Sequence, residues 1–440
     1  MNTAEISVRT PLGPIWLSSG VTRGNAFTKF YASFISIGML SGMSLLQGYI
    51  LAEHLGIPRA EQGRVLGQIT LVTEIILIAT MPIAGALADR IGRRPMLIAS
   101  ILLIALGYGL YPYATSLEEL YRYRIIYALG AAGAASIIAT LTNDYPQNRS
   151  RGKMIGFSAV MNSLGVAFVG SGLGQIPALL QPHGVDAVTG GKALFLTCSL
   201  LCLVSALIFH KGLKGGTIAE PGEQLPFKTL MTSGLRAMQN PRICLSYATA
   251  FTGRSDLVIK AIFLSLWAIQ DARSFGLNPG TAMARFGIIL LLMQIASLIW
   301  QPIYGALMDK LNRVTASMIS LALAAIGYTS MALITSPLDF KMMPFFIILT
   351  LGSSSAIMAS IALVGQEAPP KERGAVIGVN GMFGALGILI FSYYGGIWFD
   401  EWRPAAPFIV IGLVQAALLL VALVIRLKAP GHIPAKAKTA

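Results

Sequence analysis

Charged residues are scarce in this chain. Asp, Glu, Lys and Arg make up 12% of its 440 residues, whereas a soluble globular domain carries about 25%. Hydrophobic residues make up 55%, and the mean hydropathy is +0.68. The polar surface is therefore too small to cover a water-soluble globule. We predict an integral, multi-pass membrane protein whose solvent is the lipid bilayer.

Cysteine and histidine are also rare, and their placement argues against metal sites. The 3 cysteines, Cys198, Cys202 and Cys244, lie in or beside apolar runs without a CxxC pair, and the 4 histidines stand singly. The sequence contains no HExxH, no Ser/His/Asp spacing and no phosphate-binding loop. We therefore expect no metal, no cofactor and no enzymatic activity. Residues 1–28 lack the compact apolar core of a removable signal peptide.

Long apolar runs dominate the rest of the chain. A membrane-spanning helix needs about 20 apolar residues, and twelve segments qualify. They lie near 30–52, 64–87, 95–113, 120–143, 153–180, 193–210, 243–270, 286–307, 314–335, 342–365, 374–398 and 405–425. The sequence therefore predicts an all-α membrane protein with 12 transmembrane helices.

The net charge of +14 follows the expected membrane topology. If the N-terminus is cytoplasmic, most Lys and Arg residues fall in cytoplasmic loops, as the positive-inside rule requires. We expect a protein of the cell (inner) membrane, with both termini cytoplasmic and no nucleic-acid partner. The predicted parts are a cytoplasmic N-terminal arm, a first six-helix bundle, a cytoplasmic linker, a second six-helix bundle and a cytoplasmic tail. Their ranges are 1–29, 30–210, 211–242, 243–425 and 426–440.

Two related turns lie half a chain apart. The first reads Gly85-Ala86-Leu87-Ala88-Asp89-Arg90-Ile91-Gly92-Arg93-Arg94-Pro95, and a weaker copy runs from Gly305 to Arg313, displaced by 220 positions. The same displacement aligns Glu74 with Gln294 and Pro82 with Pro302. A displacement of 222 aligns Gly156, Gly165 and Gly174 with Gly378, Gly387 and Gly396. These matches indicate a duplication into two sets of six helices.

The first turn resembles the loop signature of the major facilitator superfamily, Gly-x-Leu-x-Asp-Arg-x-Gly-Arg-Arg. The second copy keeps Asp309, Lys310 and Arg313 but has Asn312 in place of a glycine. The resemblance implies two six-helix bundles around a central cavity lined by the first, fourth, seventh and tenth helices. It also implies a gating role for the motif residues Gly85, Asp89, Arg90, Gly92, Arg93, Arg94, Asp309, Lys310 and Arg313. The alternative is that these residues only form basic turns that define the topology.

The fourth and fifth predicted helices compare differently with this family. Arg124 and Gly130 resemble the family's Arg-x-x-x-x-x-Gly pattern in the fourth helix, which implies a proton-relay role for Arg124 near Glu118 and Glu119. The fifth helix lacks the proline of the pattern typical of drug–proton antiporters. This departure weakens an assignment as a standard multidrug antiporter.

Four charged residues lie inside predicted spans, where a charge is costly and marks a functional candidate. They are Glu74 in the second span and Arg254, Asp256 and Lys260 in the seventh. Asp256 and Lys260 are four residues apart and can pair on one helix face. We expect these charges, with Arg124, to handle substrate or protons. The alternative is a static network of salt bridges.

The combined prediction is a secondary active transporter that moves a small organic solute by alternating access, coupled to protons. A drug or metabolite exporter and an uncoupled facilitator are the alternatives within transport. A membrane sensor or receptor on a transporter fold is the alternative from another class. The expected partners are the solute, the proton and the lipid bilayer, and we expect a monomer.

Overall fold

The computed structural model describes residues 8–9, 15–147, 151–216, 227–369 and 373–431. The side chains of Asp89, Asp256 and Asp309 lie outside the described part, as do residues 217–226 of the predicted linker and 432–440 of the predicted tail. The described chain divides into two compact units. The first comprises Met1–Ile57, Val72–Glu223 and Leu277–Gly287, and the second comprises Pro58–Leu71, Gln224–Gly276 and Ile288–Ala440.

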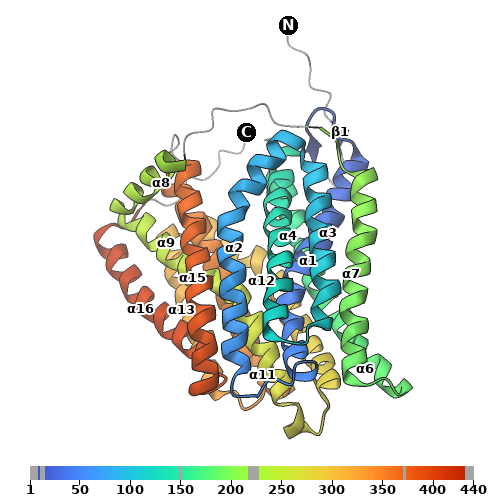
Figure 1. Ribbon diagram of the computed structural model, residues 1–440. Helices are drawn as coiled ribbons and strands as arrows, with labels where there is room; N and C mark the ends of the chain where they lie inside the picture. The colour runs from blue at the N-terminus through green and yellow to red at the C-terminus, as the bar shows by residue number, and fades with distance from the viewer. Residues whose placement is uncertain (1–7, 10–14, 148–150, 217–226, 370–372, 432–440) are drawn as a thin grey trace. The chain divides into compact units, whose positions relative to one another are not determined.

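The first unit is a bundle of long helices. Its elements are β1 (Val8–Arg9), β2 (Trp16–Leu17), α1 (Arg23–Glu53), α2 (Gln62–Ile91) from Val72 onward, α3 (Arg93–Leu110), α4 (Leu117–Asp144), α5 (Arg151–Ala167), α6 (Ile176–Leu180) and α7 (Ala187–Gly212). A π-helical segment, η3 (Phe168–Gly172), follows α5, and the short 3-10 turns η1 (Tyr111–Tyr113), η4 (Leu173–Gln175) and η5 (Gln181–His183) complete the unit. In Figure 1, α3 runs beside α4 and α7, and these pairs pack closely.

The second unit is built in the same way. Its elements are α8 (Phe227–Arg236), α9 (Pro241–Gly253), α10 (Ser255–Ile259), α11 (Ser265–Gln270), α12 (Pro279–Lys310) from Ile288 onward, α13 (Arg313–Ser330), α14 (Met343–Glu367), α15 (Arg373–Glu401) and α16 (Ala406–Lys428). The segment η7 (Lys260–Leu264) is π-helical, and η6 (Ala237–Gln239), η8 (Ala272–Phe275), η9 (Met331–Leu333) and η10 (Phe340–Met342) are 3-10 turns. Helix α13 packs between α14 and α16.

The described residues contain 11 helices that are long and apolar enough to span a membrane. The remaining predicted span, 243–270, is interrupted rather than absent. Helix α9 ends at Gly253, Arg254 forms its C-cap, and α10, η7 and α11 continue the span in short pieces. The predicted fold class, an all-α membrane protein of twelve spans, is confirmed.

The first helix begins earlier than the sequence predicted. Thr22 and Asn25 form a reciprocal capping box, so α1 starts at Arg23 and takes in residues 23–29 of the predicted arm. The polar stretch before it is held to the loop after α4. Gln147 donates its backbone N–H to the Trp16 carbonyl at 2.8 Å, and Ser18 donates to the Tyr145 carbonyl at 2.9 Å.

Each unit contains the first turns of a helix that otherwise belongs to the other unit. Residues 58–71, at the start of α2, belong to the second unit, where the backbone N–H groups of Gly63 and Arg64 donate to the Asp400 carboxylate at 2.9 and 2.6 Å. Residues 277–287, at the start of α12, belong to the first unit, where Ser171 donates to the Gly287 carbonyl at 2.6 Å. The two exchanged segments match at the displacement of 220. The duplication is therefore also visible in which helix segments group with which unit.

The closest helix contacts also repeat. A Cβ placed on Gly165 of α5 would lie 1.9 Å from the carbonyl oxygen of Phe34, and one on Gly387 of α15 would lie 1.7 Å from that of Phe251. Glycine is required at both positions because the two backbones touch there. Each contact also has a tilted aromatic pair beside it with centroids 5.4 Å apart, Phe34 with Phe168 and Phe251 with Phe391.

Candidate functional site

The first unit holds a buried cation in its core. Arg124 lies in the third turn of α4 and is 2% exposed. Its Nε donates to the Oγ1 of Thr73 on α2 at 2.7 Å, and its guanidinium lies 4.8 Å from the ring centroid of Tyr127. Its Nη1 is buried and has no hydrogen-bond partner among the described residues. A buried donor without a partner is costly, which marks Arg124 as a functional candidate.

Two tyrosines tie this cation to α1. The hydroxyl of Tyr127 donates to the Leu40 carbonyl at 3.0 Å, and the hydroxyl of Tyr108 on α3 donates to the Met39 carbonyl at 2.7 Å. The two rings meet edge to face at 6.0 Å. The cation, its aromatic neighbour and the backbone of α1 thus form one connected cluster.

Glu74 lies next to this cluster, because it directly follows Thr73, the residue that accepts from Arg124. It follows Thr73 on α2, is 9% exposed and lies within electrostatic range of the Tyr127 hydroxyl. The structure thus brings the predicted residues Glu74 and Arg124 into one region. It does not bring Arg124 to Glu118 and Glu119, because Glu118 pairs with Arg122 at 2.5 Å and Glu119 accepts from Thr115 at 2.9 Å.

The charges of the seventh span lie in the second unit. Arg254 is exposed; its Nη1 donates to the Gly381 carbonyl at 3.3 Å, and its aliphatic chain lies against Gly384. Lys260 begins the π-helical segment and donates to the Ser353 hydroxyl of α14. The predicted pairing of Lys260 with Asp256 falls on a side chain outside the described residues. In the described part of the chain, no group of three or more His, Cys, Asp or Glu could hold a metal ion.

The first motif turn is a sharp corner between α2 and α3. Gly92 has a φ of 99°, which favours glycine. Arg93 is 4% exposed and forms an ion pair with Asp144 at the end of α4, with Nε and Oδ2 3.2 Å apart. Arg90 is exposed, and the guanidinium of Arg94 lies against Gly215 beyond the end of α7. Gly85 faces the Ser136 hydroxyl across a gap just wide enough for a methyl group.

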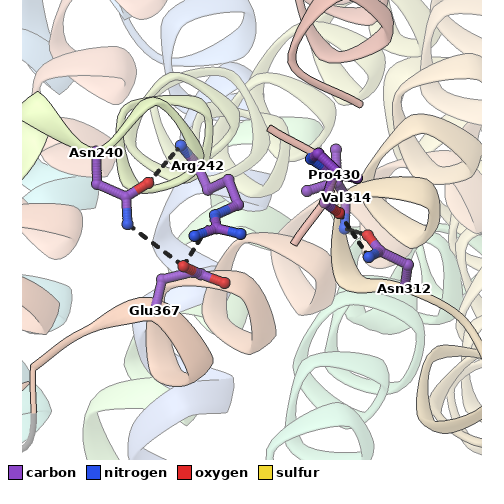
Figure 2. A network of polar contacts seen from close by, with 6 residues as sticks. All are labelled: Asn240, Arg242, Asn312, Val314, Glu367 and Pro430. Carbon is purple, nitrogen blue, oxygen red and sulfur yellow. Dashed lines mark hydrogen bonds and ion pairs between the residues drawn. The ribbon is translucent and has the colours of Figure 1, made fainter. Parts of the chain in front are cut away.

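The second motif turn replaces glycine with a capping residue. Asn312 accepts from the Val314 N–H at 2.9 Å and donates to the Pro430 carbonyl at 2.6 Å (Figure 2). The chain after α16 is thereby held at this turn. The same relation occurs in the first unit, where Gly216, beyond the end of α7, lies beside Gly92. Lys310 is exposed, and Arg313 is half-buried.

A second ion pair lies close to this turn. Arg242 at the start of α9 pairs with Glu367 at the end of α14, with Nε and Oε2 3.0 Å apart, and Asn240 donates to the same carboxylate at 3.3 Å (Figure 2). The side chains are 23% and 9% exposed. The pair joins the ends of two helices that are distant in sequence.

We expect Glu367→Gln to lower the free energy of unfolding by about 1–3 kcal/mol, because the partly buried Arg242 loses its counter-charge. Glu118→Gln is the matched control, since its ion pair with Arg122 is exposed and contributes at most about 1 kcal/mol. Denaturant unfolding of the purified protein measures both. Equal effects of the two changes would show that the Arg242 pair does not hold the helix ends together.

Several of these residues were not predicted from the sequence. Thr73, Asp144, Arg242 and Glu367 lie at or near helix ends or beside a stronger candidate, and no local pattern links them to their partners. Asp144 does follow the apolar run of α4 in a basic loop, which is a weak signal for an ion pair. Its partner Arg93 lies 51 residues earlier in the chain, so only the folded bundle reveals the contact.

Comparison with known proteins agrees with this architecture. A family model described as the Major Facilitator Superfamily matches residues 30–270 and 243–440. The magnetosome protein MamH of Paramagnetospirillum magneticum is 27% identical over 376 residues, which cover 84% of each chain. The magnetosome protein MamZ of the same organism is 25% identical, with 87% of this chain matching only 60% of that longer protein.

Among solved structures, the nucleoside transporter NupG superposes with a TM-score of 0.68 at 12% identity, covering 91% of this chain and 98% of that one. At this identity the likeness concerns the fold alone. The family model extends over both halves of the chain and includes both motif turns. The chain belongs to the Major Facilitator Superfamily of membrane transporters.

Proposed function

We propose that this chain is a secondary active transporter that moves a small solute by alternating access and draws its energy from a proton gradient. The observation that carries the proposal is the cluster of Glu74, Thr73, Arg124 and Tyr127 in the core of the first unit. Ionisable groups at this depth are costly and are retained where they serve a function.

The cluster has the parts that coupled protonation needs. A buried carboxyl is stable as the neutral acid in apolar surroundings and as the carboxylate beside a cation. A change in the distance between the Glu74 carboxyl and Arg124 therefore changes how readily Glu74 binds a proton. Because Tyr127 and Tyr108 bond to carbonyls of α1, movement of α1 on solute binding is transmitted to this cluster.

The repeated halves support the alternating-access part of the proposal. The chain belongs to the Major Facilitator Superfamily, and transporters built from two repeats alternate access by movement of one repeat against the other around a fixed site.

The test is transport by the full-length protein in liposomes with an imposed pH gradient. A panel of nucleosides, organic acids, polyols and amines is offered, and the vesicle contents are measured by mass spectrometry. We expect at least one solute to accumulate above its equilibrium level, and a protonophore to abolish that accumulation. Glu74→Gln should remove the response to the gradient, whereas Glu118→Gln, which changes an exposed carboxylate, should keep it.

The direction of the gradient that drives accumulation distinguishes symport from antiport. A symporter accumulates the solute in the vesicles when the outside is more acidic, whereas an antiporter does so when the inside is more acidic. Transport of every active solute only to equilibrium, unaffected by the gradient, would reject proton coupling and establish an uncoupled facilitator. No transport of any solute, with correctly inserted protein, would favour a receptor on the same fold.

A further inference from the structure

One face of α1 carries polar side chains that are completely buried. Lys29, Ser33, Ser36 and Gln47 are each 0% exposed. At 100° per residue, these four positions lie within about 60° of one another around the helix axis. They form a single stripe, which we call the α1 polar stripe, extending about 27 Å along the helix.

Most of this stripe is unsatisfied within the protein. The hydroxyls of Ser33 and Ser36 and both amide atoms of Gln47 have no hydrogen-bond partner among the described residues. Serines inside a helix ordinarily donate to the carbonyl four residues earlier, as Ser158 and Ser205 do here. Buried polar groups without partners destabilise a fold, and several on one helix face need a compensating interaction.

Lys29, at one end of the stripe, has no counter-charge in the part of the chain that the structure describes. Its ammonium donates to the Ser158 hydroxyl of α5 and lies 5.4 Å from the Phe30 ring centroid. No carboxylate of a described residue pairs with it. An ammonium has three donors, and a serine hydroxyl accepts only one of them. The remaining donors and the positive charge are available to an anion.

The second unit shows that the fold does not need this polarity. Phe34 and Phe251 hold equivalent places, because their carbonyls touch the equivalent glycines Gly165 and Gly387. The same register of 217 residues places Ser246 at the position of Lys29, and Ala250 and Gly253 at those of Ser33 and Ser36.

The equivalent of Lys29 in the second unit is also fully satisfied. Ser246 donates to the Ser360 carbonyl at 2.7 Å and to the Asn380 amide oxygen at 3.2 Å, and Ser360 donates back to the Ser246 carbonyl at 2.9 Å. In the second unit, a network of neutral hydrogen bonds therefore satisfies the position equivalent to Lys29. In the first unit, α1 carries a buried cation there, and the hydroxyls of Ser33 and Ser36 have no partner among the described residues. The difference points to a ligand for the first unit.

We propose that Lys29, Ser33 and Ser36 bind the transported solute, and that this solute is a small organic anion bearing hydroxyl groups. Its carboxylate contacts Lys29, and its hydroxyls bond to Ser33 and Ser36. The three residues extend about 10 Å along α1, which suits an extended chain of about six carbons. Because the stripe is closed in this structure, the solute reaches it only when the packing around α1 opens, so the inference rests on the alternating access proposed above.

Gluconate, sorbitol and glucamine provide a matched set of probes. They share a polyhydroxylated six-carbon chain and differ at one end, which carries a carboxylate, a hydroxymethyl group or an ammonium group. Binding to the purified full-length protein is measured by titration calorimetry and by the shift in thermal unfolding. We expect gluconate to bind and to raise the unfolding temperature, and sorbitol and glucamine to do neither at the same concentration.

Lys29→Gln should weaken gluconate binding roughly ten- to hundredfold, as expected for the loss of a hydrogen bond to a charged group. The double change of Ser33→Ala and Ser36→Ala should weaken gluconate binding while keeping the preference over glucamine. Lys211→Gln removes an exposed lysine from the same unit, and Ser246→Ala changes the equivalent position in the second unit. Both controls should bind gluconate like the wild type.

Equal binding of gluconate and sorbitol, or undiminished gluconate binding in Lys29→Gln, would overturn the inference. If Lys29→Gln does not fold, the serine double variant decides the question in the same way. If the wild type transports other solutes but binds gluconate, sorbitol and glucamine equally, the inference about the solute is overturned while the proposed function remains. A wild type that binds gluconate but transports nothing in liposomes would reject the proposed function, and Lys29, Ser33 and Ser36 would then be an anion site that does not serve transport.

Discussion

Gly165→Ala and Gly387→Ala should each strongly destabilise the protein. The added methyl carbon would lie 1.9 Å from the Phe34 carbonyl oxygen in the first case and 1.7 Å from the Phe251 carbonyl oxygen in the second. Both distances are far below van der Waals contact, and a backbone atom cannot rotate away as a side chain can. The helices must therefore separate, and we expect a loss of about 3 kcal/mol, at the upper end of the usual range for overpacking.

The chain supplies matched controls for this experiment. Gly156 and Gly378 lie nine residues before the two contact glycines on the same helices, and no heavy atom lies within 4 Å of a Cβ placed on either. Gly156→Ala and Gly378→Ala should be neutral or slightly stabilising, because alanine is the better helix former. Denaturant unfolding and the yield of monodisperse protein measure all four variants. Equal tolerance of alanine at all four sites would contradict the close contacts.

Arg124→Gln should slow proton-driven transport roughly ten- to hundredfold while leaving the protein folded. The change removes the cation that donates to Thr73 and lies over the Tyr127 ring. Loss of a hydrogen bond from a charged group corresponds to a change of roughly ten- to hundredfold. Arg124→Lys should also be impaired, because an ammonium cannot reproduce the planar guanidinium contacts with both neighbours.

Arg122→Gln is the control for the loss of an arginine on α4. Arg122 is exposed and pairs only with Glu118 on the same helix, so we expect wild-type transport within about twofold. Initial rates of gradient-driven uptake into liposomes, normalised to correctly inserted protein, give the comparison. Wild-type rates in Arg124→Gln would show that this buried cation is structural and would remove it from the coupling scheme.

The sequence predicted the architecture well because its signals are local and repeated. Long apolar runs define the spans, and the acid, arginines and glycines between Gly85 and Pro95 mark a turn that recurs at Gly305. The spacing of Gly165 and Gly387 reflects a constraint that the structure explains, since both glycines touch a carbonyl of an adjacent helix. Helix pairs whose backbones touch require glycine at the contact, and the spacing of these glycines can be recognised in the sequence.

The start of α1 is not marked by the apolar run. That run begins after Lys29, so hydropathy alone assigns Lys29 to a polar arm. The capping box of Thr22 and Asn25 marks the true start of the helix. With the helix starting at Arg23, Lys29 and Ser33 fall on one helix face, and the α1 polar stripe becomes visible.

Contacts between side chains on distant helices cannot be predicted from the sequence. The neighbour of Arg124 is Thr73, 51 residues earlier on another helix, whereas Glu118 and Glu119 are near in sequence but turn to other partners. The break in the seventh span likewise depends on packing, since Arg254 and Lys260 lie against α15 and α14. Side-chain pairing between distant helices follows from tertiary packing, which a single sequence does not encode locally.

The most direct test of proton coupling measures proton and solute fluxes together. Liposomes containing the wild-type protein are loaded with a pH-sensitive dye, and a solute identified by the transport panel is added without any imposed gradient. We expect a change of internal pH that starts with solute movement, scales with its rate and disappears in Glu74→Gln. Solute movement with no accompanying change of pH in the wild type would contradict it.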